Sequence, residues 1–178
     1  MDEFAQLQAG RDTVANIPDR AEPGVYAIFA RERDCLPSIS IPPSELVYIG
    51  LSGDLAQRNH FKAKHSGFHS PRRSFGAILK DQLQLQAIPR GSGRSKTNYR
   101  CYRFSDEDEQ KLTDWMRANL EYAVCPYSGD IDALEANLIE GLEPPLNLTN
   151  WANPQKRHIQ ALRAACADEA KTLWLDRT

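Results

Sequence analysis

Two short apolar runs, PGVYAIFA at 23–30 and LVYIGLS at 46–52, constrain the fold of this chain more than any other feature. Both are rich in β-branched and aromatic residues and have proline or glycine at their ends, which is typical of strands. The 31–45 segment between them contains three prolines, which predicts an extended loop or a short ribbon. If the two strands pair antiparallel, Tyr26 and Tyr48 can lie on the same side of the sheet.

The alternation of side chains along a strand also assigns the neighbours of these tyrosines. On a period of two, Tyr26 shares a face with Ile28, and Tyr48 with Leu46 and Gly50. Apolar spacing, caps and breakers predict the remaining elements. We expect helices from Ser52 or Asp54, from Ser74, at 105–120, at 130–142 and from Asn153, and strands at 98–104 and 121–127. The sequence thus predicts one α+β domain over 1–178, with a core of about 23–148 and a C-terminal helix at 153–175.

Composition narrows the class of protein. The chain has 178 residues, 41% of them hydrophobic, which is enough for one domain with a core of its own. No apolar run is long enough to span a membrane, and the acidic N-terminal segment does not resemble a signal peptide. Four scattered cysteines without a metal-binding spacing indicate reduced thiols. We therefore expect a cytoplasmic protein without a membrane partner.

The net charge of −2 conceals a strong asymmetry along the chain. Residues 58–103 contain eleven lysines and arginines but one acid, a formal charge of +10, whereas residues 104–143 carry −9. Two interpretations are open: two solvated faces of opposite sign, or a basic surface that binds a polyanion. In the second interpretation, the candidate nucleic-acid contacts are Arg72, Arg73, Arg90, Arg94, Lys96 and Arg100.

A carboxylate falls within the apolar stripe of the helix predicted at 130–142. Glu135 lies near the middle of a stripe formed by Ile131, Leu134, Leu138, Ile139 and Leu142. Burying an unpaired carboxylate is costly, so Glu135 requires a cation, several hydrogen bonds or an open cleft. Arg58 leans toward the apolar side of its own helix. Either the two residues form a structural ion pair, or both face a cleft in which the arginine meets a phosphate and the glutamate a metal ion.

Taken in order, these residues resemble the GIY-YIG nuclease family. The resemblance rests on Gly24-Val25-Tyr26, Tyr48-Ile49-Gly50, Arg58 in the following helix, Glu135 in LEANLI and Asn147 in PPLN. It spans about residues 23–148. It implies a small antiparallel sheet of three to four strands flanked by helices, and a protein that cuts nucleic acid, mostly DNA, with one divalent cation.

The resemblance also implies a role for each residue. Glu135 would bind Mg²⁺ or Mn²⁺, because a lone carboxylate with waters and phosphate suits a hard cation. Arg58 would hold the scissile phosphate, Tyr26 would activate the attacking water, and Tyr48 would support it or contact the phosphate. Asn147 would fix the site by hydrogen bonds.

One departure from the family pattern concerns proton transfer. Many members have a histidine one turn after the arginine, where this chain has Lys62. Lys62 or the nearby His65 could take that place. We therefore predict a metal-dependent DNA endonuclease, with a catalytically silent nucleic-acid-binding module on the same scaffold as the alternative. RNA as substrate, the target sequence or structure, the role in restriction, repair or defence, and the oligomeric state stay open.

Overall fold

The structure is a computed structural model, and it describes residues 2–13, 21–56, 61 and 66–175. Its contacts divide the chain into two compact units. The first unit comprises Met1–Phe61 and Met116–Pro154, and the second comprises Lys62–Trp115 and Gln155–Thr178. The single domain predicted over 1–178 stays a prediction.

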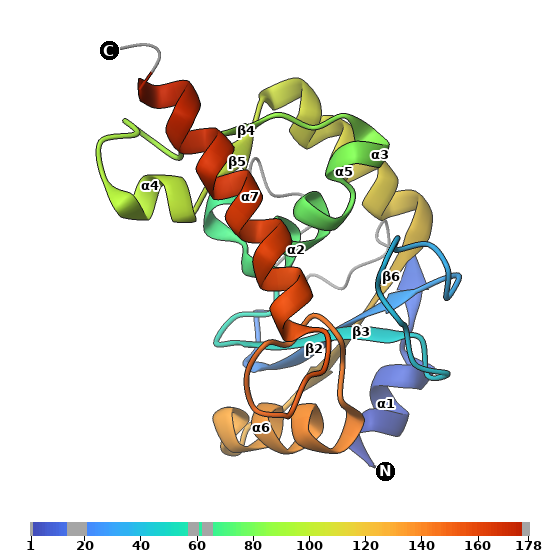
Figure 1. Ribbon diagram of the computed structural model, residues 1–178. Coiled ribbons are helices and arrows are strands. Elements are labelled where there is room, and N and C mark those ends of the chain that lie inside the picture. Colours follow the sequence, from blue (N-terminus) through green and yellow to red (C-terminus); the bar gives the residue numbers. More distant parts are fainter. Residues whose placement is uncertain (1, 14–20, 57–60, 62–65, 176–178) are drawn as a thin grey trace. The chain divides into compact units, whose positions relative to one another are not determined.

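The first unit is built on a four-stranded antiparallel sheet (Figure 1). Its strand order is β1-β6-β2-β3, so β3 lies at one edge and β2 is central. The strands are β1 Asp12–Thr13, β2 Gly24–Ala30, β3 Leu46–Ser52 and β6 Leu120–Pro126, and the helices of this unit are α1 Glu3–Ala9 and α6 Ile131–Leu142. The predicted strands at 24–30, 46–52 and 121–127 are thereby confirmed, as is the α+β fold with an antiparallel sheet and flanking helices.

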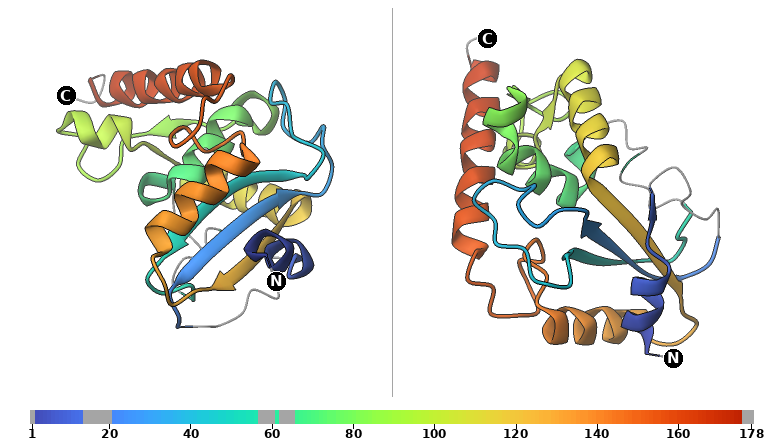
Figure 2. Two further views of the ribbon diagram at one scale, coloured as in Figure 1. Left: turned by 90° about the horizontal axis from the view of Figure 1, so that it is seen from below. Right: turned by 90° about the vertical axis from the view of Figure 1, so that its right-hand side faces the viewer.

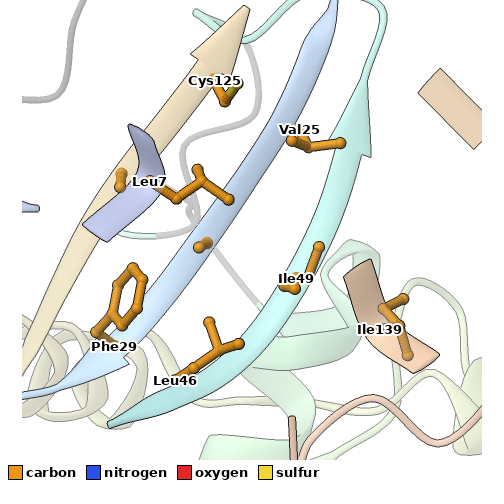
Figure 3. Close-up of a cluster of buried hydrophobic side chains, with 9 residues drawn as sticks. Leu7, Val25, Phe29, Leu46, Ile49, Cys125 and Ile139 are labelled. Atoms are coloured by element: carbon orange, nitrogen blue, oxygen red, sulfur yellow. The ribbon is translucent and has the colours of Figure 1, made fainter. Parts of the chain in front are cut away.

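One face of this sheet forms the hydrophobic core of the unit (Figure 3). Alternate residues of β2 point into it together with Leu7 of α1 and Ile139 of α6. The full cluster is Leu7, Val25, Ala27, Phe29, Leu46, Ile49, Ala123, Cys125 and Ile139. Since α1 and α6 both contribute to this cluster, both helices cover the same face of the sheet, as the views in Figure 2 show.

The place of Leu46 in this cluster corrects the predicted faces. Ile28 pairs with Tyr48, but Phe29 pairs with Leu46, so the register shifts at this point. Such a bulge turns the bulged strand relative to its partner. Leu46 therefore packs with Phe29 in the core and does not share the face of Tyr48.

The second unit contains several short elements packed beside one long helix. α7, Lys156–Leu175, lies along α2, α4 and β4 (Figure 1). The other elements are η2 Ser66–Phe68, α2 Ser70–Ile78, α3 Lys80–Leu83, β4 Ala87–Ile88, α4 Lys96–Arg100, β5 Arg103–Phe104 and the greater part of α5 Asp106–Asn119. β4 and β5 form a separate antiparallel pair. The side chains of Tyr102 and Phe104 are fully buried, with ring centroids 5.6 Å apart.

Two predicted elements of the second unit differ in the structure. The helix expected from Ser74 begins at Ser70, with Pro71 in its first turn, because proline suits that position. The helix is interrupted at Leu79, which separates α2 from α3. Helix α3 ends at Leu83, because the next residue, Gln84, adopts a left-handed conformation with φ of 53°. Of the strand expected at 98–104, residues 98–100 form the end of helix α4 and only the last two residues form a strand, β5.

The last helix also begins later than predicted. Asn153 does not cap it, because its side-chain amide donates to the backbone oxygens of Pro145 at 2.8 Å and Asn147 at 2.9 Å. α7 therefore begins at Lys156. The helix at 105–120 is confirmed as α5, and the Ser105 hydroxyl accepts from the Asp108 N–H as a cap does. Most of the helix expected after Asp54 lies outside the described residues.

Candidate active site

The face of the sheet opposite the hydrophobic core carries a row of tyrosines. Tyr26 on β2 and Tyr48 on β3 have ring centroids 6.1 Å apart. Tyr122 on β6 stacks on Tyr26 at 5.5 Å, and Phe61 meets the edge of Tyr122 at 5.9 Å. The structure therefore brings Tyr26 and Tyr48 together on one face, as the alternation of the two strands allows and their register requires.

Gly50 makes room for the ring of Tyr26. The two residues are paired across β2 and β3. A Cβ atom added at Gly50 would lie 2.5 Å from Cζ of Tyr26 and would overlap its hydroxyl. The glycine of the second tripeptide thus allows the tyrosine of the first to lie directly over the backbone of β3.

Asn147 binds the outer edge of β3, which is the edge that does not pair with β2. Its side-chain oxygen accepts from the Ile49 N–H at 2.9 Å, and its amide donates to the Ile49 oxygen at 2.8 Å. The Leu146 N–H donates to the Val47 oxygen at 3.0 Å. An asparagine side chain and a short backbone segment thus take the place of a neighbouring strand along the exposed edge.

Glu135 meets the same edge two residues further along. The carboxylate is half-buried on α6, as its place in the apolar stripe predicts. Burial and, after it, the nearby Asp132 raise its pKa, whereas a backbone hydrogen bond from Leu51 lowers it. Three consecutive residues of β3 are therefore each contacted by one candidate side chain: Ile49 by Asn147, Gly50 by Tyr26 and Leu51 by Glu135.

The remaining predicted site residues lie outside the described part of the chain. These are Arg58, Lys62 and His65. No ion pair between described residues involves Glu135. Whether Glu135 pairs with Arg58 or both face a cleft therefore stays open.

Arg72, predicted as a nucleic-acid contact, points into the second unit. Its side chain is 0% exposed and pairs with Glu109, which is 3% exposed, at 2.9 Å. Arg72 also donates to the Glu109 backbone oxygen and the Thr113 hydroxyl, both at 2.7 Å. A guanidinium enclosed in this way cannot reach a phosphate at the surface. The assignment of Arg72 to the nucleic-acid surface is therefore corrected to a structural ion pair.

The other basic candidates all belong to the second unit. Arg94, Lys96 and Arg100 are exposed, and Arg90 is half-buried. Arg73 is 9% exposed, and its Nη1 donates to the Gly67 oxygen at 3.0 Å. Arg73 thus lies deeper than the sequence indicates, although it is not enclosed in an ion pair with any described residue.

Sequence reasoning missed Tyr122. The alternation of EYAVCPY predicts its side of the strand, but only the strand order shows that β6 lies next to β2. A second aromatic residue beside Tyr26 extends the tyrosine-lined face across three strands. The sequence therefore indicated the side of the strand on which Tyr122 lies, but not which strand would be its neighbour.

This arrangement defines a class of small α+β domain, in which a tyrosine-lined sheet face and a helix-borne carboxylate meet at one edge strand. The family model described as the GIY-YIG catalytic domain matches residues 24–166. The chain therefore belongs to the GIY-YIG family, which is a family of nucleases that generally use divalent metal ions. No curated protein and no solved structure matches the chain. None of the described helices is both long and apolar enough to cross a membrane.

Proposed function

We propose that the protein is a divalent-metal-dependent endonuclease that hydrolyses DNA phosphodiester bonds. The observation that supports this most is the meeting of Tyr26, Glu135 and Asn147 on three consecutive residues of β3. A strand places successive residues about 3.3–3.4 Å apart, so these three side chains attach within about 7 Å along β3. That is the scale of one phosphodiester group with its attacking water and one cation.

The chemistry of Glu135 fits a hard cation. No group of three or more potential metal ligands gathers among the described residues. Mg²⁺ and Mn²⁺ do not require such a cage, because they keep several waters and bind through one or two carboxylates plus substrate phosphate. The burial and the nearby Asp132 that disfavour the Glu135 anion would be offset by a bound cation. Glu135 would hold the ion, which when bound polarises the phosphoryl oxygens and stabilises their charge.

The side chains of the chain itself would perform the proton transfers. Tyr26, ionised to its phenolate, would take the proton of the attacking water at its phenolic oxygen while the new P–O bond forms and the bond from phosphorus to the leaving oxygen breaks. Tyr48, whose ring lies 6.1 Å from that of Tyr26, would support it or contact the phosphate. Arg58 would bind the phosphate, and Lys62 or His65 would give a proton to the leaving oxygen.

Asn147 would act through β3. It is 6% exposed and binds both backbone groups of Ile49. Fixing Ile49 also fixes the next residue, Gly50, over which Tyr26 lies. We therefore assign Asn147 a positioning role.

The test is a cleavage assay with Mg²⁺ or Mn²⁺ on plasmid, linear, branched and single-stranded DNA, with matched RNA. We expect cleavage by the wild type and a loss of at least about a hundredfold for Glu135→Gln, since a metal ion contributes several kcal/mol to the transition state. Glu140→Gln is the matched control, because Glu140 is exposed on the same helix. Wild-type protein that leaves every substrate intact would refute the proposal. Intact nucleic-acid binding in that case would favour the catalytically silent module.

A further inference from the structure

The second unit exposes one large hydrophobic side chain among the described residues. Phe68, in η2, is 65% exposed. The guanidinium of Arg90 lies over its ring, 4.7 Å from the ring centroid. An exposed aromatic ring beside a cation is not needed for the core of this unit, which Tyr102, Phe104 and Phe75 fill from within.

The local backbone is shaped to hold Arg90 in this position. The Arg90 side chain crosses Gly67, where an added Cβ would lie 2.9 Å from Cδ of Arg90 and 3.1 Å from the Cys101 oxygen. Nη1 of Arg90 donates to the Gly67 oxygen at 3.1 Å. The backbone N–H of Arg90 donates to the backbone oxygen of Asn98 at 3.0 Å, which fixes the backbone from which the arginine side chain extends.

Two further arginines lie near this site. Nη1 of Arg73 donates to the same Gly67 oxygen at 3.0 Å, so the two Nη1 atoms are at most 6.1 Å apart. Arg163 of α7 approaches the Ser70 and Ser74 hydroxyls of α2 at 3.4 and 3.5 Å. The positive charges of Arg163 and Arg90 both lower the pKa of Arg73, after the larger effect of burial.

No acidic side chain forms an ion pair with these arginines within the described part of the chain. None of the ion pairs there involves Arg73, Arg90 or Arg163, and Nε of Arg73 is buried without a hydrogen-bond partner. The charges of Arg90 and Arg163 both act unfavourably on Arg73, and an anion bound beside them would relieve that repulsion. Arginine pairs with phosphate through two parallel hydrogen bonds, so phosphate is the anion that suits them.

We propose that Phe68, Arg90 and Arg163 form a binding site for an unpaired nucleotide, in which the base stacks on Phe68 and the arginines bind the flanking phosphate. An aromatic platform beside a positive groove is the pattern with which proteins hold single-stranded nucleic acid. A base inside a duplex cannot reach Phe68 without unstacking, so the site selects single strands, flaps or unpaired junction bases. This inference rests on the proposed function, because it assumes that the chain acts on nucleic acid. It narrows the substrate class to nucleic acid with unpaired bases.

Binding without divalent cations tests this site separately from cleavage. Full-length protein is titrated with fluorescein-labelled oligothymidylate and with a duplex of equal length. We expect Phe68→Ala to weaken binding of the single strand by about 5- to 150-fold, the effect of losing one stacked base, and Phe68→Trp to retain it. Binding to the duplex should change less than about twofold. An Arg163→Gln variant should lower the slope of log affinity against log salt concentration by about 0.7.

Arg103→Gln is the matched control for charge. Arg103 belongs to the same unit but pairs with the exposed Asp106 at 3.2 Å, so its replacement should leave single-strand binding unchanged. The inference is overturned if the wild type does not bind the single strand, or if Phe68→Ala binds it as the wild type does. A Phe68 effect in a protein that cuts no substrate supports this site and contradicts only the proposed nuclease activity.

Discussion

Replacing Asn147 by alanine tests the edge of β3 directly. The change removes both hydrogen bonds to Ile49, at 2.9 and 2.8 Å, and leaves one backbone donor and one acceptor without their partners. An unsatisfied buried group costs about 1–3 kcal/mol, so the two together should lower the free energy of unfolding by about 2–6 kcal/mol. The low end applies if water enters the space that the side chain leaves.

Two measurements check this prediction. Urea unfolding followed by circular dichroism gives the loss of stability, and amide hydrogen exchange measured by NMR gives the protection of the Ile49 N–H. We expect that protection to fall in Asn147→Ala, because the N–H of Ile49 loses its acceptor. Asn137→Ala is the control, since Asn137 is exposed on α6 and alanine is the better helix former. A loss below about 0.5 kcal/mol with Ile49 still protected would refute the role of Asn147.

Three further changes follow from the geometry. Glu135→Gln should raise stability at neutral pH by about 1 kcal/mol, as commonly happens when a destabilised functional group is replaced. Because the pKa of Glu135 is raised in the folded state, its carboxyl stabilises the fold below its ordinary pKa and loses that contribution as pH rises through the raised value. The gain of Glu135→Gln in urea unfolding should therefore shrink toward acid pH, and an equal gain at every pH would contradict this account. Gly50→Ala should cost about 1–3 kcal/mol and displace Tyr26, reducing cleavage more than DNA binding; unchanged cleavage kinetics would show that Tyr26 need not lie over β3. Arg72→Met should lower stability by about 3–5 kcal/mol because it leaves Glu109 buried and unpaired, whereas a wild-type melting temperature would show that the pair is dispensable.

The first unit was predictable because its signals are local. The strands at 24–30 and 46–52 have apolar, β-branched runs with proline or glycine at their ends, and the spacing of α6 places Glu135 within an apolar stripe. Alternation allows Tyr26 and Tyr48 to share a face, and the register that pairs Tyr26 with Gly50 and Ile28 with Tyr48 makes them do so. The bulge that moved Leu46 into the core was not predictable, because it too depends on the pairing of β2 with β3.

The second unit was less predictable because its determinants are distant or mutually competing. The residues 98–104 alternate like a strand, but the reciprocal bonds between Ser95 and Asn98 begin a helix there. Arg72 belongs to a basic block that suggested a surface, yet its partner Glu109 lies 37 residues away in the sequence. Charge patterns alone do not distinguish a buried ion pair from a solvated face.

The three contacts on β3 mean that the spacing of residues 49–51 determines the spacing of Asn147, Tyr26 and Glu135. Because side chains alternate along a strand, inserting or deleting one residue within 49–51 would turn Gly50 or its neighbours to the wrong side and break the spacing between Asn147 and Glu135. The loop at 31–45 contributes none of these contacts and can change in length without altering them. Related chains should therefore differ most in that loop and keep the length of β3 constant.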